Sequence, residues 1–322
     1  SDAVPTNKAS GDYSSFFYNP FRKKWCFSIK EGTSRGRSRY YLECDEFLKG
    51  ADWDKAVFWT STDRLDEPEP EENYPGAGDT PQLYSLNAVA YESLMIGMHY
   101  IHRGPNNGIC NKGKFPKLVD LELGFSRDGF HWDRPDRSGF IKGSRVEGSW
   151  DRGYLHSTAG VFVVLDDKLI FPYMGTSGIA PGGHRGMYTG GSIGLATLRR
   201  DGFASMDGSG ELTTRPVQFS GKHLFINATG KLRVELIDGK NNKVLAASKP
   251  ASGDHTKQRI EWNDLDDLSR FSGKPVRFRF HLNDGELYSF WVTPDEHGAS
   301  NGYVGAGGPA FNGVRDIKSS TK

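Results

Sequence analysis

Two carboxylates, Asp12 and Glu92, are the side chains of this sequence best suited to chemistry. Glu92 stands in the nearly continuous apolar run 88–101, where removal from water would raise the pKa of its carboxyl group. A protonated carboxyl group can act as a general acid, and an ionised partner such as Asp12 as the base or nucleophile. Both residues also have ordinary interpretations, because Glu92 can pair with an arginine as a buried structural ion and Asp12 can cap a turn.

Several other polar and aromatic side chains are candidates for ligand binding. His156 can hydrogen-bond a ligand hydroxyl, although a histidine bonded for structural reasons fits the sequence equally well. The Gly-rich segment 175–191 is long enough to act as a lid over a substrate. The expected ligand-binding residues are His156, Asp151, Arg152, Tyr91, His184 and Arg185. The sequence has no CxxC and no persuasive metal-ligand spacing, so we expect no metal and no cofactor.

A repeated strand and turn would position these residues. The strings TSTDRLD at 60–66, SRDGFHW at 126–132 and TLRRDGF at 197–203 each follow a short apolar run. A strand, an aspartate turn and an aromatic residue that recur in this way are typical of β-propeller blades. We expect the repeated aspartates (Asp63, Asp128 and Asp201) to bond amides of their own turns and to take no part in catalysis.

The composition favours an all-β protein and excludes several classes of partner. Forty glycines and 12% aromatic residues among 322 indicate many tight turns and β-rich packing. The net charge of +1 gives no electrostatic basis for binding nucleic acid or an anionic membrane, and no apolar run is long enough for a membrane span. Cys26 and Cys44 lie in adjacent predicted strands, where they can form a disulfide or remain free.

The pattern of strands divides the chain into three parts. Residues 1–208 hold about three predicted propeller blades, residues 209–294 a β-sandwich of six short strands, and residues 295–322 a Gly-rich surface tail. The acidic, proline-rich segment 65–81 is expected to be a solvated surface loop.

Three quoted strings carry a resemblance to a known group of enzymes. The opening DYSSFFYNP at 12–20, LGFSRDGFHW at 123–132 and GLATLRRDGFASMD at 194–207 resemble five-bladed β-propeller glycoside hydrolases of families 32 and 43, and most of all bacterial family 32-like proteins. The resemblance covers residues from about 12 to 293. It implies a secreted or periplasmic hydrolase whose channel-facing carboxylates, Asp12 and Glu92, act on a fructoside, arabinoside or related glycan.

Two alternatives to this type of glycoside hydrolase stay open. The first is a carbohydrate-binding propeller that has lost its acid and base, and the second is a sialidase-like enzyme, although no arginine triad is recognisable. Three blades are also fewer than the five that close such a ring. The sequence therefore predicts that an N-terminal segment or a second chain completes the propeller.

Overall fold

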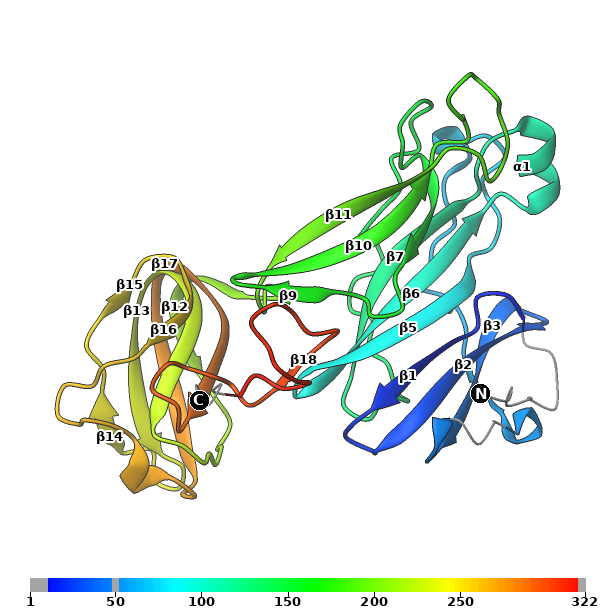
Figure 1. Cartoon of the computed structure of the whole chain (residues 1–322). Helices are drawn as coiled ribbons and strands as arrows, with labels where there is room; N and C mark the ends of the chain where they lie inside the picture. The colour runs from blue at the N-terminus through cyan, green and yellow to red at the C-terminus, as the bar shows by residue number, and fades with distance from the viewer. Residues whose placement is uncertain (1–10, 48–51, 318–322) are drawn as a thin grey trace. The chain divides into compact units, whose positions relative to one another are not determined.

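The protein is nearly all β, as the sequence predicted (Figure 1). The computed structural model describes residues 11–47 and 52–317. The chain divides into two compact units, the first made of Ser1–Val163 and Ile170–Ala196, the second of Val164–Leu169 and Thr197–Lys322. The expected boundary at 208/209 therefore falls inside the second unit.

The first sheet is an antiparallel hairpin extended by two further strands. Its strands run in the order β1 (Ser15–Asn19), β2 (Lys24–Thr33), β3 (Gly36–Cys44) and β4 (Val57–Thr60). Asn19 shapes the first turn, because its Oδ1 accepts hydrogen bonds from the amides of the two residues after Pro20. A short 3₁₀ helix, η2 (Trp53–Lys55), precedes β4.

The second sheet pairs β5 (Gln82–Glu92), β6 (Leu94–Gly104) and β7 (Leu118–Ser126). The 3₁₀ helix η3 (Glu71–Asn73) precedes these strands, and the helix α1 (Asn107–Gly113) connects β6 to β7. The apolar run 88–101 is thus a hairpin.

The third sheet has the order β11-β10-β8, with β9 paired to β10. Its strands are β8 (Gly153–Ser157), β9 (Val163–Leu165), β10 (Lys168–Thr176) and β11 (Gly191–Arg199). The three sheets correspond one for one to the three expected blades.

Asp63 and Asp128 bond amides of their own turns, as expected, whereas Asp201 accepts a hydrogen bond from the hydroxyl of Ser289. Oδ1 of Asp128 accepts hydrogen bonds of 2.9 Å from the amides of Phe130 and His131, which closes the turn. Trp132 then lies on β6 at Gly97, where any Cβ would come within 2.6 Å of the indole ring. Glycine at this position is therefore required by close packing.

The second unit differs in detail from the predicted sandwich of six short strands. Its strands are β12 (Met206–Thr213), β13 (His223–Asp238), β14 (Val244–Ala247), β15 (Ala251–Ser252), β16 (His255–Arg259), β17 (Val276–Thr293) and β18 (Tyr303–Val304), and η4 (Ser269–Phe271) is a 3₁₀ turn. Six short strands would require turns near 229–230 and 284–285, but β13 and β17 continue through these positions as long strands. A Cβ on Gly230 would come within 2.2 Å of the Asp284 carbonyl oxygen, so this glycine allows the strands to bend together.

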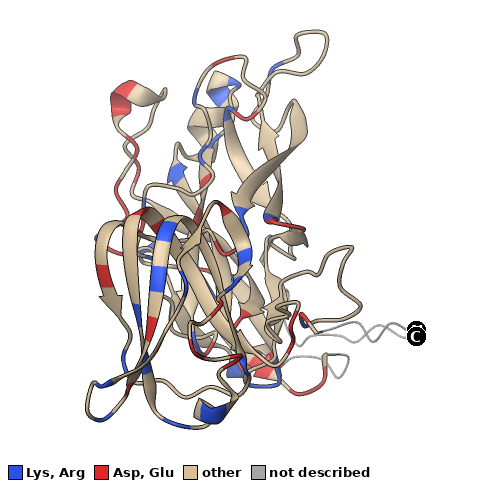
Figure 2. Cartoon of the chain, turned by 90° about the vertical axis from the view of Figure 1, so that its left-hand side faces the viewer, with Lys and Arg blue, Asp and Glu red and all other residues tan. Residues whose placement is uncertain are grey.

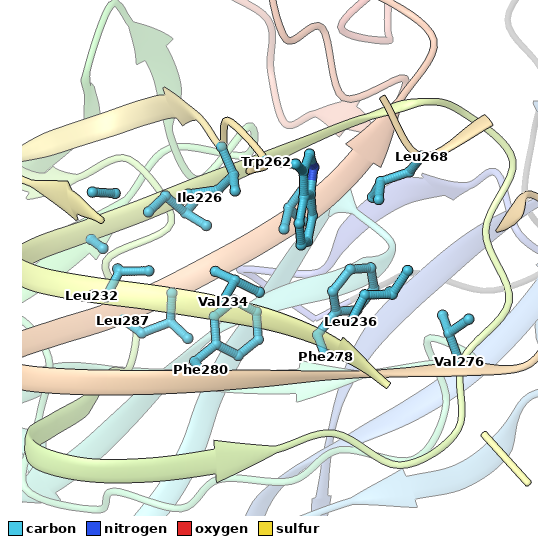
Figure 3. Packing of buried hydrophobic residues seen from close by; sticks show 14 of the residues in the cluster. Ile226, Leu232, Val234, Leu236, Trp262, Leu268, Val276, Phe278, Phe280 and Leu287 are labelled. Carbon is cyan, nitrogen blue, oxygen red and sulfur yellow. The ribbon is translucent and has the colours of Figure 1, made fainter. Parts of the chain in front are cut away.

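The core of the second unit lies between these long strands and the segments packed against them. Figure 3 shows Val234 and Phe280 among the buried side chains, with Trp262 and Leu268 contributed from outside the two strands. The predicted surface tail is not exposed at every position. Val304 is fully buried, and Asp316 forms a 2.9 Å ion pair with Arg200.

Charges of both signs are interspersed along the chain (Figure 2). In the second unit Arg279 of β17 forms a 3.3 Å ion pair with Glu235 of β13, so opposite charges pair across neighbouring strands. Across residues 11–47 and 52–317, no helix combines the length and the hydropathy that crossing a bilayer requires. Cys26 and Cys44 are free thiols; Trp25 pairs with Cys44 across the ladder, so the two cysteines point to opposite faces.

Candidate functional site

The two expected catalytic carboxylates lie at opposite ends of the first unit's central strand. Asp12 pairs with Lys30 and precedes Tyr13, whose ring contacts Tyr84 near the beginning of β5. Glu92 is the last residue of β5, in the turn to β6, with a φ of 48°. Eight residues of strand separate Tyr84 from Glu92, or roughly 26 Å at the usual rise per residue. The expected pair is therefore wrong, because glycoside hydrolysis needs carboxyl groups within about 5–10 Å of one another.

The expected ligand-binding residues are also dispersed. Tyr91 is buried against Phe162 at the Glu92 end, and the Asp151 carboxylate accepts a 2.5 Å hydrogen bond from the hydroxyl of Ser149. Arg152 lies over the ring of Tyr74 at 5.3 Å. Their positions support a structural role for these three side chains.

The loop between β10 and β11 does not bring its two predicted residues together on a ligand. His184 is exposed, and Arg185 forms an exposed ion pair of 2.7 Å with Glu147. Tyr188 of the same loop reaches Tyr154, with 5.4 Å between the ring centroids. Of the expected residues, only His156 and, at the edge, Asp12 belong to the cluster described next.

The first strands of the three sheets bring aromatic side chains together around one lysine. We call this cluster the tyrosine–lysine site. Tyr13 precedes β1, Tyr84 lies on β5, and Tyr154 and His156 lie on β8. The site consists of Tyr13, Tyr84, Tyr154, Tyr188, His156 and Lys117, all from the first unit. Lys117 directly precedes β7, and its Nζ lies 4.6 to 5.4 Å from the ring centroids of three of these tyrosines.

Two hydrogen bonds link the polar atoms of the site. The hydroxyl of Tyr13 lies 3.3 Å from Nδ1 of His156, and the hydroxyls of Tyr84 and Tyr154 are 3.0 Å apart. Tyr13 and Tyr154 have positive φ angles of 59° and 53°, a region that bulky residues rarely adopt. Such local strain is typical of positions where function requires a particular side-chain direction.

A buried arginine fixes two of these tyrosines through the backbone. Arg39 is fully buried, and its guanidinium donates hydrogen bonds to the carbonyl oxygens of Tyr13 at 2.8 Å and Tyr84 at 3.1 Å. Its remaining bonds go to Ser28. Arg39 therefore positions the site without touching a carboxylate.

Two further cations surround the ring of Tyr84. Nζ of Lys30 lies 5.1 Å from its centroid and the guanidinium of Arg37 lies 5.5 Å from it. Lys30 pairs with Asp12, whereas Arg37 donates to the neutral amide oxygen of Gln82 at 2.8 Å. Lys117 likewise donates to a neutral amide, Oδ1 of Asn107, at 3.1 Å.

The cluster thus has four cations, namely Lys30, Arg37, Arg39 and Lys117, with one carboxylate, Asp12. In the described part of the chain, Arg37, Arg39 and Lys117 form no ion pair with an acidic group. Buried positive charge that lacks a counter-charge is costly, so this arrangement favours an anion from outside the chain.

Burial changes the proton affinity of the site in a consistent direction. It lowers the pKa of Lys117 to about 8, with nearby Arg37 adding to the effect, and lowers the pKa of His156 to about 3. Burial also raises the pKa of Tyr13 and of Tyr84. At neutral pH the tyrosines and His156 are therefore uncharged, and Lys117 is a cation that loses its proton unusually easily.

The site is accessible from solvent. Tyr13 is 38% exposed and Tyr188 is 59% exposed, while Lys117 and His156 are buried behind them. Beside it, Gly36 and Gln82 help to line an open depression of about 890 Å³. A depression of this volume accommodates a small oligosaccharide.

Most of this site could not be predicted from the sequence, because no local sequence pattern connects its residues. The tyrosines come from four separate segments, and each resembles an ordinary β-sheet aromatic residue when read alone. Lys117 between Pro116 and Leu118 was the one unusual residue, a lysine directly before a buried strand. Its burial could have been anticipated from that position.

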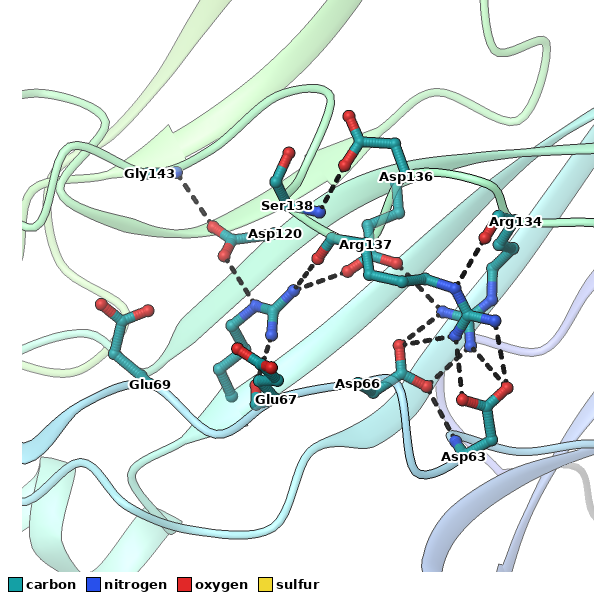
Figure 4. A network of polar contacts seen from close by, with 12 residues as sticks. Asp63, Asp66, Glu67, Glu69, Asp120, Arg134, Asp136, Arg137, Ser138 and Gly143 are labelled. Atoms are coloured by element: carbon teal, nitrogen blue, oxygen red, sulfur yellow. Dashed lines mark hydrogen bonds and ion pairs between the residues drawn. The ribbon is translucent and has the colours of Figure 1, made fainter.

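A second charged cluster in the same unit has the opposite character. In this arginine–carboxylate network (Figure 4), Arg134 bonds Asp66 at 2.7 Å and Glu122 at 3.0 Å, and Arg103 bonds Glu122 at 2.6 Å. Its members are Arg103, Arg134, Arg137, Arg145, Asp63, Asp66, Glu69, Asp120 and Glu122. The expectation of a solvated loop at 65–81 is wrong at Asp66, Glu69 and Tyr74, which are at most 5% exposed.

The tyrosine–lysine site has the means to hold a sugar ring and an anionic group. Tyrosine faces stack on sugar rings, and lysine and arginine bind carboxylate, sulfate or phosphate. The Tyr13–His156 pair adds a hydroxyl whose proton can move to a neutral imidazole.

Comparisons with known proteins give only remote similarities. No family model matches the sequence, and no curated protein matches it. Similar solved structures include one titled a glycoside hydrolase, with a TM-score of 0.35 and 8% identity over 88% of this chain and 70% of the other. The GH32 β-fructofuranosidase of Bombyx mori gives a TM-score of 0.33 and 9% identity over 85% of this chain and 64% of the other, so this chain spans less than two thirds of its length.

A putative glycoside hydrolase from Parabacteroides distasonis gives a TM-score of 0.29 and 12% identity over 93% of this chain and 79% of the other. At TM-scores of 0.29 to 0.35, these similarities assign neither a family to this chain nor a role to any of its residues.

Proposed function

We propose that the first unit binds a negatively charged glycan at the tyrosine–lysine site. The observation that carries this proposal is the excess of buried positive charge, because three cations beside the tyrosines have no acidic partner in the described part of the chain. A carboxylate or sulfate on a sugar would supply the missing charge, and exposed faces of Tyr13 and Tyr188 would stack on its ring. A secreted or periplasmic location would suit such a ligand.

Hydrolysis of a glycan is the second candidate. It is favoured by the carboxylate of Asp12 at the edge of the site, and it needs a second carboxyl group within about 10 Å. Glu92 is too distant for that role. We also propose that an N-terminal segment or a second chain completes the propeller and supplies the second carboxyl group. The exposed apolar side chains of Ile193 and Leu195 on β11 support such a neighbour.

Calorimetric titration tests the proposed function directly. The full chain is titrated with an oligogalacturonate and with a neutral oligosaccharide of equal length. We expect the acidic ligand to bind and the neutral ligand to bind at least tenfold more weakly, since only the first satisfies the cations. Equal affinities for the two ligands would contradict the proposal.

Two variants locate the binding. Lys117→Met removes the central cation, and Lys112→Met removes an exposed lysine of α1 as a matched control. We expect only Lys117→Met to lose the preference for the acidic ligand. Unchanged binding in both variants would place the ligand elsewhere.

A further inference from the structure

We infer that the tyrosine–lysine site catalyses β-elimination on a bound uronic acid, with Tyr13 as the catalytic base and acid. This inference rests on the proposed binding of an acidic glycan at the same site. It concerns cleavage of a sugar linkage by a route that needs no pair of carboxylates. Three features of the site support it.

The first feature is the position of the cations. A uronate has its carboxylate on C5, and the proton on C5 becomes acidic only when that negative charge is neutralised. The charged groups of Lys30, Arg37 and Lys117 all surround the ring of Tyr84, at 5.1 to 5.5 Å from its centroid. They would hold the carboxylate and stabilise the charge that develops when the C5 proton leaves.

The second feature is the Tyr13–His156 pair. Tyr13 is 38% exposed, and its hydroxyl lies 3.3 Å from Nδ1 of His156. His156 is 6% exposed, and its Nε2 has no hydrogen-bond partner in the described part of the chain. Burial and the nearby Lys117 disfavour a charged imidazole in the free site. The carboxylate of a bound uronate would offset both, so Nδ1 of His156 accepts the phenolic proton of Tyr13 only in the complex.

The third feature is the set of groups that keep this pair in place. Arg39 and the hydroxyl of Ser85 both donate hydrogen bonds to the carbonyl oxygen of Tyr13, at 2.8 and 3.0 Å. Tyr154 packs edge-on against His156, with 4.2 Å between the ring centroids. The base is therefore held rigidly although its side chain reaches solvent.

The reaction proceeds without a co-reactant. His156 accepts the Tyr13 phenolic proton, and the Tyr13 oxygen then takes the proton from C5 of the uronate. The electrons of that C–H bond form the C4–C5 double bond, and the C4–O bond breaks with its electron pair on the leaving oxygen. Tyr13 gives the C5 proton to this oxygen, and His156 returns the phenolic proton to Tyr13.

The experiment follows the ultraviolet absorbance of the C4–C5 unsaturated product. The full chain is incubated with mannuronate-rich alginate, in which the C5 proton and the C4 oxygen lie on the same face of the ring, so one residue can serve as base and as acid. Polygalacturonate, in which they lie on opposite faces, and a neutral glucan are the controls. We expect absorbance to rise with alginate and with neither control. Tyr13→Phe should lower that rate at least a hundredfold while the affinity measured by calorimetry stays within threefold.

His156 acts through Tyr13 and is a positioning residue, so its variant needs a different measurement. In His156→Gln, Tyr13 must lose its proton to solvent, and the rate should rise steadily with pH. The wild-type rate should be level up to the pH at which Lys117 loses its charge. An equal loss of rate at every pH would show that His156 serves only the packing.

The outcomes separate this inference from the proposed function. Binding of polyuronate without unsaturated product overturns the elimination and leaves the binding proposal standing. New reducing ends without ultraviolet absorbance indicate hydrolysis and likewise overturn it. Failure to bind any polyuronate overturns both.

Discussion

The first unit contains two buried charge clusters that differ in how their charges are compensated. In the arginine–carboxylate network every arginine bonds at least one carboxylate, and four arginines share five acidic groups. In the tyrosine–lysine site the cations face neutral tyrosines and amides. The first cluster is complete within the chain and holds loops to strands, whereas in our proposal a bound anion completes the second.

The largest effect should come from breaking the complete cluster. Arg134→Met leaves Asp66 and Glu122 buried without one of their partners, and removing one partner of a buried ion pair costs about 3–5 kcal/mol. We expect the urea midpoint to fall accordingly. Arg185→Ala, which breaks an exposed pair, should leave the midpoint unchanged.

The matching change in the incomplete cluster should act on affinity and not on stability. Lys117→Met removes a buried cation that has no acidic partner, so the free energy of unfolding should stay the same or rise. Affinity for an oligogalacturonate should fall at least tenfold, or about 1.4 kcal/mol. A destabilisation like that of Arg134→Met would show that Lys117 belongs to the frame.

The contrast between these clusters also explains what could be predicted from the sequence. The strands, the three blades and the aspartate turns follow from local patterns, such as SRDGFHW at 126–132 with its Asp128 turn. The apolar run 88–101 was compatible with one strand or with two, so the pattern could not locate the turn at Glu92. Glu92 itself adopts the positive φ of the turn, which sequence patterns rarely assign to glutamate.

Long-range partners were the part that local patterns could not supply. Segment 65–81 is acidic and rich in proline, which alone predicts a solvated loop. Ion pairs with Arg134, Arg137 and Arg145, about 70 residues further along the chain, bury part of it instead. The tyrosine–lysine site likewise unites segments whose separation in sequence exceeds 140 residues, as with Tyr13 and His156. Only the packing of the three sheets brings these residues together.

Raising the pH should change stability and ligand affinity in opposite directions. The pKa of Lys117 is lowered to about 8 in the folded state, so above that pH the unfolded chain binds more protons than the folded chain, and stability rises toward the usual lysine pKa. Over the same range Lys117 loses the positive charge that would bind the ligand, and affinity for the acidic ligand should fall by up to about tenfold per pH unit. Tyr84, Tyr154, Tyr188, Arg37, Lys30 and Cys110 surround Lys117. Burial raises the pKa of Tyr84, Tyr154 and Cys110, so these three groups keep their charge state at the start of this window.

Calorimetry and urea unfolding from pH 7 to pH 9.5 test this opposition. In Lys117→Met both pH dependences should flatten. Affinity that stays level through this range in the wild type would remove Lys117 from the ligand contacts.

The smallest effects are expected at Asp12 and Glu92, the two carboxylates that the sequence suggested for catalysis. Asp12→Asn frees Lys30 from its only described acidic partner, so affinity for the acidic oligosaccharide should rise by about two- to threefold, given that the Asp12 side chain is 65% exposed and its pairing is weakened by solvent. Glu92→Gln, at the other end of β5, should change neither affinity nor elimination, because its carboxyl group lies roughly 26 Å from Tyr84. Loss of sugar cleavage in Glu92→Gln would instead place the chemistry at the β5–β6 turn, and the excess of positive charge around Tyr84 would then have to serve binding alone.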